Sequence, residues 1–132
     1  MPPKYRSTPR STQATISTAN AAVDGTGTMT EIMAGTANGT EFDYSAVGAR
    51  GNTTDGWIRF FRSTDNGTTK RLVPGGEVRV TKRDVLGDRP RWAWVWRPPG
   101  GITLKDANDK LYIATENAET FDVFSQGADL TA

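Results

Sequence analysis

A chain of 132 residues is long enough for one domain with an ordinary core and too short for two. It contains no cysteine and no histidine, which excludes disulfides, thiolate chemistry and the commonest general base and metal ligand. With 16 basic and 15 acidic side chains the net charge is +1, so nothing favours nucleic acid as a partner.

The first 13 residues, MPPKYRSTPRSTQ, differ from the rest of the chain. They carry three prolines and the cations Lys4, Arg6 and Arg10 without any acid, and they have no apolar stretch resembling a signal peptide. So polar a segment buries too little surface to fold alone. We therefore predict a flexible basic N-terminal arm over residues 1–13 that contacts another chain, and a β-sandwich domain over residues 14–132.

Beyond the arm, short threonine-rich and alternating segments are separated by turn signals. These signals are Asp24-Gly25, Asn38-Gly39, Asn66-Gly67, Pro74-Gly75-Gly76 and Gly100-Gly101. In the segment 56–63, GWIRFFRS, alternation places Ile58 and Phe60 on one face and Phe61 on the other. No window has a helical period of apolar residues, and no stretch of about 18 apolar residues suggests a membrane span.

About eight or nine short strands at regular spacing are typical of an all-β sandwich or barrel. We expect a jelly-roll-like β-sandwich of about eight strands, because that architecture combines two sheets of four strands. An immunoglobulin-like sandwich is the nearest alternative.

No group of residues forms a convincing catalytic or metal site. Serine and threonine nucleophiles lack a histidine base, so we expect no enzymatic activity. Glu116 and Glu119 could pair as glycosidase carboxylates, but turn acids are the better interpretation. Asp106, Asn108 and Asp109 could hold calcium, but they lack EF-hand spacing, so an Asx-rich turn is favoured. We expect no cofactor, no metal and no small-molecule substrate.

The segment RWAWVWRPPGG at 91–101 places Trp92, Trp94 and Trp96 at alternate positions. Three indoles make a large apolar surface, which could be core, a platform for sugar rings or a subunit interface. The other face of the strand offers Ala93 and Val95, which suit inward packing. A strand that is apolar on both faces needs two covers, and another subunit is the simplest second one. We therefore predict a homotrimer with at least two of these tryptophans at the interface.

Charge is unevenly distributed along the chain. Residues 50–97 hold 11 basic and 5 acidic side chains, whereas residues 105–132 hold 2 basic and 6 acidic ones. A chain polarised in this way pairs its own patches or those of its copies.

Four segments resemble a family of small virion proteins of tailed bacteriophages. They are ANAAVDGTGTMTEI at 19–32, GWIRFFRSTDNGTTKRLV at 56–73, EVRV at 77–80 and, most specifically, NAETFDVFSQGADL at 117–130. The similarity spans most of residues 17–130. The chain departs from the family pattern at 83–104, where the tryptophan-rich segment replaces a plainer aliphatic strand.

The resemblance implies a jelly-roll decoration or cement protein, made in the bacterial cytoplasm and bound to the outside of the phage head. Its expected partners are further copies of itself and the major capsid protein. The alternative is a receptor- or carbohydrate-binding module of a tail or baseplate. The residues predicted to make subunit or capsid contacts are Lys4, Tyr5, Arg6, Arg10, Arg91, Trp92, Trp94, Trp96 and Arg97.

Overall fold

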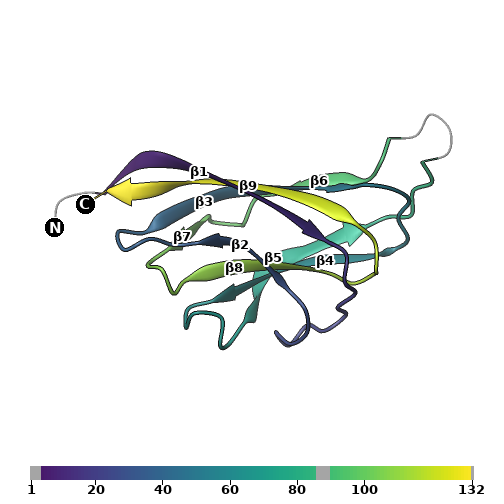
Figure 1. The fold of residues 1–132 in the computed structure, drawn as a ribbon, viewed down its shortest axis with the longest axis horizontal. Helices are drawn as coiled ribbons and strands as arrows, with labels where there is room; N and C mark the ends of the chain where they lie inside the picture. The colour runs from purple at the N-terminus through teal and green to yellow at the C-terminus, as the bar shows by residue number, and fades with distance from the viewer. Residues whose placement is uncertain (1–3, 86–89, 132) are drawn as a thin grey trace.

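The computed structural model describes residues 4–85 and 90–131, which form nine β-strands (Figure 1). The strands are β1 (Tyr5–Ile16), β2 (Thr30–Ala34), β3 (Thr40–Ala49), β4 (Gly56–Ser63), β5 (Arg71–Val80), β6 (Ala93–Trp96), β7 (Ile102–Leu104), β8 (Lys110–Thr115) and β9 (Phe121–Thr131). The described residues form no helix at all, so they include none that could cross a membrane.

The strands build two antiparallel sheets that pack as a sandwich, which confirms the predicted all-β sandwich class. Sheet A has the order β1-β9-β3-β6, and β7 pairs with the part of β3 that β6 leaves free. Sheet B has the order β2-β8-β4-β5. The first and last strands therefore pair with each other, and the start of β1 at Tyr5 lies beside the end of β9 at Thr131 (Figure 1).

The core fills the space between the sheets with side chains from alternate positions of both. Ile58 and Phe60, which the sequence predicts to share one face of β4, both face the core, and Phe121 and Val123 of β9 meet them from sheet A. All four are at most 1 % exposed. Burying a side chain of this size contributes about 1.5–3 kcal/mol, so packing alone can hold a fold that has no disulfide.

A second, smaller cluster lies on the outer face of sheet B. Phe61, Tyr112 and Ala114 are buried there against the partly buried side chains of Met29 and Leu72. Met29 belongs to the segment between β1 and β2, which is thereby packed against this face. The chain thus covers this part of the outer face of sheet B with its own loop.

Asn20 holds that loop in place. Its side-chain amide donates to the carbonyls of Thr26 and Thr28, and its backbone N–H donates to Thr115 at the end of β8. At the far side of the loop, a Cβ on Gly25 would lie 1.8 Å from the carbonyl oxygen of Lys70. Only glycine fits there, and its φ of 90° also favours glycine.

The predicted break at Pro74-Gly75-Gly76 is wrong, because β5 continues through it. Both halves of β5 pair with β4, and the register shifts between the Arg59–Glu77 and Phe61–Leu72 pairs. A β-bulge absorbs the extra residues without ending the strand. The predicted turn at Asn66-Gly67 is confirmed: both residues have positive φ, 62° and 88°.

The predicted N-terminal arm is wrong for residues 5–13, since β1 runs from Tyr5 to Ile16 and pairs with β9 along its length. Residues 1–3 lie outside the described residues. A long polar segment forms a strand here because the partner, β9, supplies the backbone hydrogen bonds that the segment cannot make alone. The sandwich therefore includes residues from Tyr5 onward.

The cations of this strand pair with acids of sheet A. Arg6 donates to Asp43 at 2.6 Å and to Glu41 at 2.7 Å, and Arg10 donates to Asp129 at 2.9 Å. The hydrogen bond from Arg6 holds the pKa of Asp43 below its ordinary value of 3.8. In this part of the molecule the basic side chains therefore pair with acidic side chains of the same chain.

Hydrogen exchange tests the correction directly. We expect the hydrogen-bonded amides of β1 between Arg10 and Ile16 to exchange far more slowly than those of an unstructured peptide, because they pair with β9. Two-dimensional NMR in deuterated buffer measures the rates residue by residue. Unprotected amides throughout residues 5–13 would instead show that this segment is a flexible arm, as the sequence predicts.

Candidate binding surface

Two of the three tryptophans belong to the core. Trp92 and Trp96 are 4 % and 3 % exposed. The Trp96 indole stacks on Phe60 with ring centroids 3.9 Å apart, and its N–H donates to the carbonyl of Gly75 at 3.0 Å. Trp92 meets Phe121 edge to face at 5.7 Å. The β5 bulge therefore supplies the polar partner that a buried indole needs.

Trp94 is different, since 55 % of it is exposed. The prediction that at least two of the three tryptophans lie at an interface is therefore wrong, and so is a sugar platform made of three indoles. The suggested inward packing of Ala93 and Val95 is wrong too, because both are exposed. The two large indoles fill the core, and the small residues face outward.

Exposed apolar side chains gather on the outer face of sheet A. We call this surface the outer patch; it consists of Ala46, Ala93, Val95 and Phe124. Trp94 pairs with the core residue Val47, so its exposed side chain lies on the other side of the strand, at the β6 edge of the sheet. In the ladder Ala46 pairs with Val95 on one side and with Phe124 on the other, so three neighbouring strands contribute. Val95 and Phe124 are each 49 % exposed. Together with its neighbours the outer patch lines a shallow hollow of about 560 Å³.

Charged groups flank the outer patch on two sides. On one side Arg50 forms a fork with Asp122, at 2.8–3.1 Å, and Thr15 donates to the same carboxylate. The hydrogen bonds from Arg50, which have the largest effect, and from Thr15 hold the pKa of Asp122 below its ordinary value of 3.8. On the other side the guanidinium of Arg97 lies 4.9 Å from the centre of the Tyr44 ring. An apolar centre with a polar rim is the usual anatomy of a protein–protein contact.

The two sheets differ in how their outer faces are covered. The loop before β2 covers the Phe61 cluster of sheet B, as described above. Among the described residues, no segment covers Val95 or Phe124 in the same way. Large exposed apolar residues that lie together mark interaction sites more often than isolated ones do.

The predicted contact residues do not form one site. Lys4, Tyr5, Arg6 and Arg10 lie at the β1 edge of sheet A, whereas the outer patch lies toward the β6 edge. Lys4 donates to the carbonyl of Asn38, and Tyr5 is 63 % exposed.

Two of the other predicted contact residues, Trp94 and Arg97, lie near the outer patch. Arg97 lies at its rim and the exposed Trp94 lies next to it at the β6 edge, whereas Arg91 is exposed beside the buried Trp92. Sequence reasoning missed Phe124 and Val95 as contact residues. The alternation in β9 contains this information: Phe121 and Val123 share the core face, so Phe124, which follows Val123 directly, faces outward.

The acidic residues considered for chemistry have structural partners. Glu116 pairs with the buried Arg59 at 3.1 Å, and Glu119 accepts a hydrogen bond from the backbone of Thr54 at 2.7 Å. Asp106 accepts from the N–H of Asn108, as an Asx turn requires. Asp109 is bound by Arg62. In residues 4–85 and 90–131 no group of three or more acidic side chains is arranged to hold a metal ion.

The outer patch is thus the surface on which the described residues concentrate exposed apolar side chains. Comparison with protein-family models and with curated proteins finds no match to this chain.

Proposed function

We propose that this protein is a capsid decoration, or cement, protein of a tailed bacteriophage. In this proposal it is made in the bacterial cytoplasm, binds the outside of the head as part of the virion, and stabilises the capsid lattice by non-covalent contacts. The observation that carries the proposal is the exposed outer patch on sheet A. The four sequence segments that resemble small phage virion proteins support the same assignment.

Cementing needs a complementary surface repeated over many copies and no chemical step. Contacts that are weak one at a time become strong when copies are linked, because each further contact is intramolecular. A buried aromatic anchor ringed by polar groups is the arrangement in which interface energy concentrates. Phe124 has the size for such an anchor, Val95 lines the same hollow, and Arg50 lies beside Phe124.

The jelly-roll assignment is part of this proposal. The strand orders β1-β9-β3-β6 and β2-β8-β4-β5 support it, because the first strand pairs with the last and the chain repeatedly crosses between sheets. Since β6 and β7 share one edge of β3, they occupy a single strand position, which gives eight positions in two sheets of four.

The proposed partners are two further copies of the chain and the major capsid protein. A closed cyclic trimer gives every copy the same contacts and fits a local threefold position in an icosahedral lattice. Sedimentation equilibrium of the purified protein tests this, with an expected mass three times 14.3 kDa. A single species at 14.3 kDa at all concentrations would contradict the trimer.

Add-back to phage heads that lack this protein tests the role of the outer patch. We expect Val95→Glu to weaken binding to such heads at least about tenfold, because a charge replaces an apolar contact of about 1.4 kcal/mol or more. Val23→Glu is the matched control, since Val23 is similarly exposed, 54 %, but lies in the loop before β2. Quantitative co-sedimentation of protein with heads measures both.

Equal binding by Val95→Glu and the wild type would contradict the use of the outer patch. The receptor- or carbohydrate-binding alternative now rests on one exposed indole, Trp94, because the other two are buried. Glycan binding by the purified protein that Trp94→Ala abolishes would favour that alternative. Absence of binding to heads, together with glycan binding, would replace the cement proposal.

A further inference from the structure

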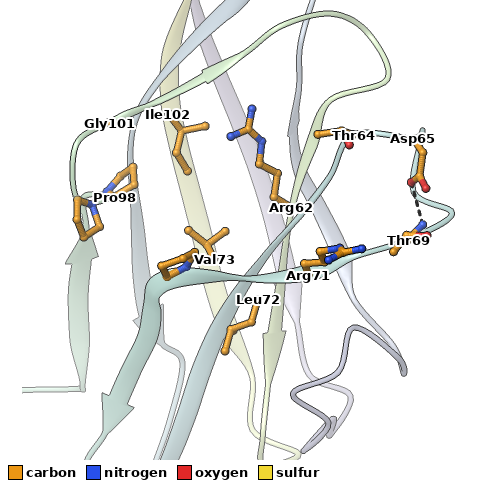
Figure 2. A pocket seen from close by; sticks show the side chains of 12 residues that line it. Arg62, Thr64, Asp65, Thr69, Arg71, Leu72, Val73, Pro98, Gly101 and Ile102 are labelled. Carbon is orange, nitrogen blue, oxygen red and sulfur yellow. Dashed lines mark hydrogen bonds between the residues drawn. The ribbon is translucent and has the colours of Figure 1, made fainter.

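A second hollow lies at the open edge of the sandwich, away from the outer patch. It has a volume of about 630 Å³, which is within the range of small-ligand sites. The end of β4, the start of β5 and the loop between β6 and β7 contribute its lining, so it is bounded by both sheets. We call it the edge pocket; Figure 2 shows the residues that line it.

One part of the edge pocket is apolar. Its side chains are Leu72, Val73, Pro74, Pro98, Pro99 and Ile102. None of these is aromatic, so the pocket has no ring on which a sugar or a nucleobase would stack. An aliphatic group is the chemistry that this wall suits.

The other part of the edge pocket is polar. Thr64, Asp65, Thr69 and Arg71 lie together on one side in Figure 2, and Pro98, Val73 and Ile102 lie on the other. A ligand that fills the pocket therefore meets polar and apolar groups at opposite ends.

Two arginines line the polar part as direct cross-strand partners. Arg62 of β4 pairs in the ladder with Arg71 of β5, and like charges placed opposite each other are destabilising. Arg62 is compensated, because it donates to Asp109 at 2.6 and 2.8 Å. No acidic side chain of the described residues forms an ion pair with Arg71.

Asp65 limits the charge of an anion that could bind beside Arg71. Its carboxylate accepts hydrogen bonds from the Thr69 N–H at 2.8 Å and the Ser63 hydroxyl at 2.7 Å. These bonds hold the pKa of Asp65 below its ordinary value of 3.8, so it is negatively charged at neutral pH. A dianion such as phosphate is repelled by this charge more strongly than a single carboxylate is.

We propose that the edge pocket binds a monocarboxylate with an aliphatic body. Arg71 receives the carboxylate through its fork of N–H donors, which matches carboxylate geometry. The aliphatic body lies against the proline-rich wall. This site is separate from the outer patch and does not depend on the decoration function.

Titration of the isotopically labelled protein, followed by NMR, tests the proposal. The probe is N-acetyl-leucine, and its controls are N-acetyl-leucinamide, which has the same body without the charge, and inorganic phosphate. We expect N-acetyl-leucine to shift the amides of Thr69, Leu72 and Ile102 saturably. We expect both controls to bind at least tenfold more weakly.

Substitutions separate binding from folding. Arg71→Gln should weaken N-acetyl-leucine binding at least tenfold, and Arg71→Lys should weaken it too, because lysine lacks the fork. Arg79→Gln is the matched control, since Arg79 lies on the same strand outside the pocket and is 49 % exposed. It should bind like the wild type. Arg71→Gln should not lower the urea midpoint of the free protein, because it removes a like-charge pair.

Several results would overturn the proposal. One is the lack of a saturable shift at the three amides with N-acetyl-leucine, and another is binding of N-acetyl-leucinamide or phosphate as tight as that of the acid. Unchanged affinity in Arg71→Gln would exclude Arg71 as the carboxylate partner. A lowered urea midpoint in that variant would assign Arg71 a structural role instead.

Discussion

Replacing Trp96 with alanine is expected to lower the free energy of unfolding by about 3–5 kcal/mol, the usual cost of deleting a buried aromatic side chain. The indole stacks on Phe60 and contacts Phe42, with ring centroids 3.9 and 5.7 Å apart. Its loss also leaves the Gly75 carbonyl without the indole N–H. Urea denaturation followed by circular dichroism measures the change.

Trp94→Ala is the matched control, because it deletes the same side chain two residues away. Trp94 is 55 % exposed, so the free energy of unfolding of the monomer should fall by clearly less than in Trp96→Ala, about 1–2 kcal/mol. Equal losses in the two variants would show that Trp94 is packed as firmly as Trp96, which would contradict the described arrangement of β6. Measurement at a protein concentration where the chain is monomeric keeps assembly out of the comparison.

The second large effect is expected from Asp109→Asn, which should destabilise the fold by about 2–3 kcal/mol through the loss of charge-assisted hydrogen bonds. The Asp109 side chain is 1 % exposed and accepts from Arg62 and from the backbone N–H of Lys105. An asparagine offers one acceptor oxygen in place of two and leaves Arg62 without a countercharge. Asp106→Asn is the control and should be nearly neutral, because asparagine also forms Asx turns.

The same carboxylate makes stability depend on pH in acid. Burial raises the pKa of Asp109, but the hydrogen bonds from Arg62 and Lys105 outweigh burial, and the pKa lies below the ordinary value of 3.8. The unfolded chain therefore binds a proton at higher pH than the folded chain does. The stabilisation is complete above the ordinary pKa and is lost as the pH falls through the folded pKa.

Asp109→Asn should accordingly lose less stability than the wild type between pH 5 and pH 2, and the two curves should converge in acid. Urea midpoints measured across this range provide the comparison. Parallel curves for the two proteins would show that Asp109 is not stabilised by its partners. Other paired carboxylates, such as Asp43 and Asp122, also make stability fall in acid. Their contribution is the same in both proteins and cancels in the difference between the two curves.

Most of the fold follows from local patterns in the sequence. Alternation in β4 correctly places Phe60 and Phe61 on opposite faces, because side chains of a strand point to the two faces in turn. Asn66-Gly67 predicts a tight turn because both residues tolerate positive φ. Such signals depend on residues next to each other in the chain.

The errors arise where long-range pairing decides the structure. Residues 5–13 lack apolar content, so local composition predicts an arm, but β9 provides a partner 111–126 residues away along the ladder. Pro74-Gly75-Gly76 has the composition of a turn, yet pairing with β4 on both sides keeps β5 in one sheet. In both cases a neighbouring strand overrides the local preference.

The candidate site was predicted only in part, for a related reason. Alternation shows that Trp92 and Trp96 share a face, but it does not say which face points inward. The adjacent Ala93 and Val95 are apolar as well, so both orientations agree with the sequence. Contacts with Phe60 and Phe121, from distant strands, settle the orientation.

Image reconstruction of intact virions from the genome that encodes this chain tests the central proposal most directly. The decoration role predicts density for the sandwich on the outside of the head at repeated lattice positions, with Val95 and Phe124 facing a neighbouring subunit. Density for the chain only at the tail or baseplate, or none on the particle, would contradict that role. Density on the head with Val95 and Phe124 facing solvent would contradict the assignment of the outer patch.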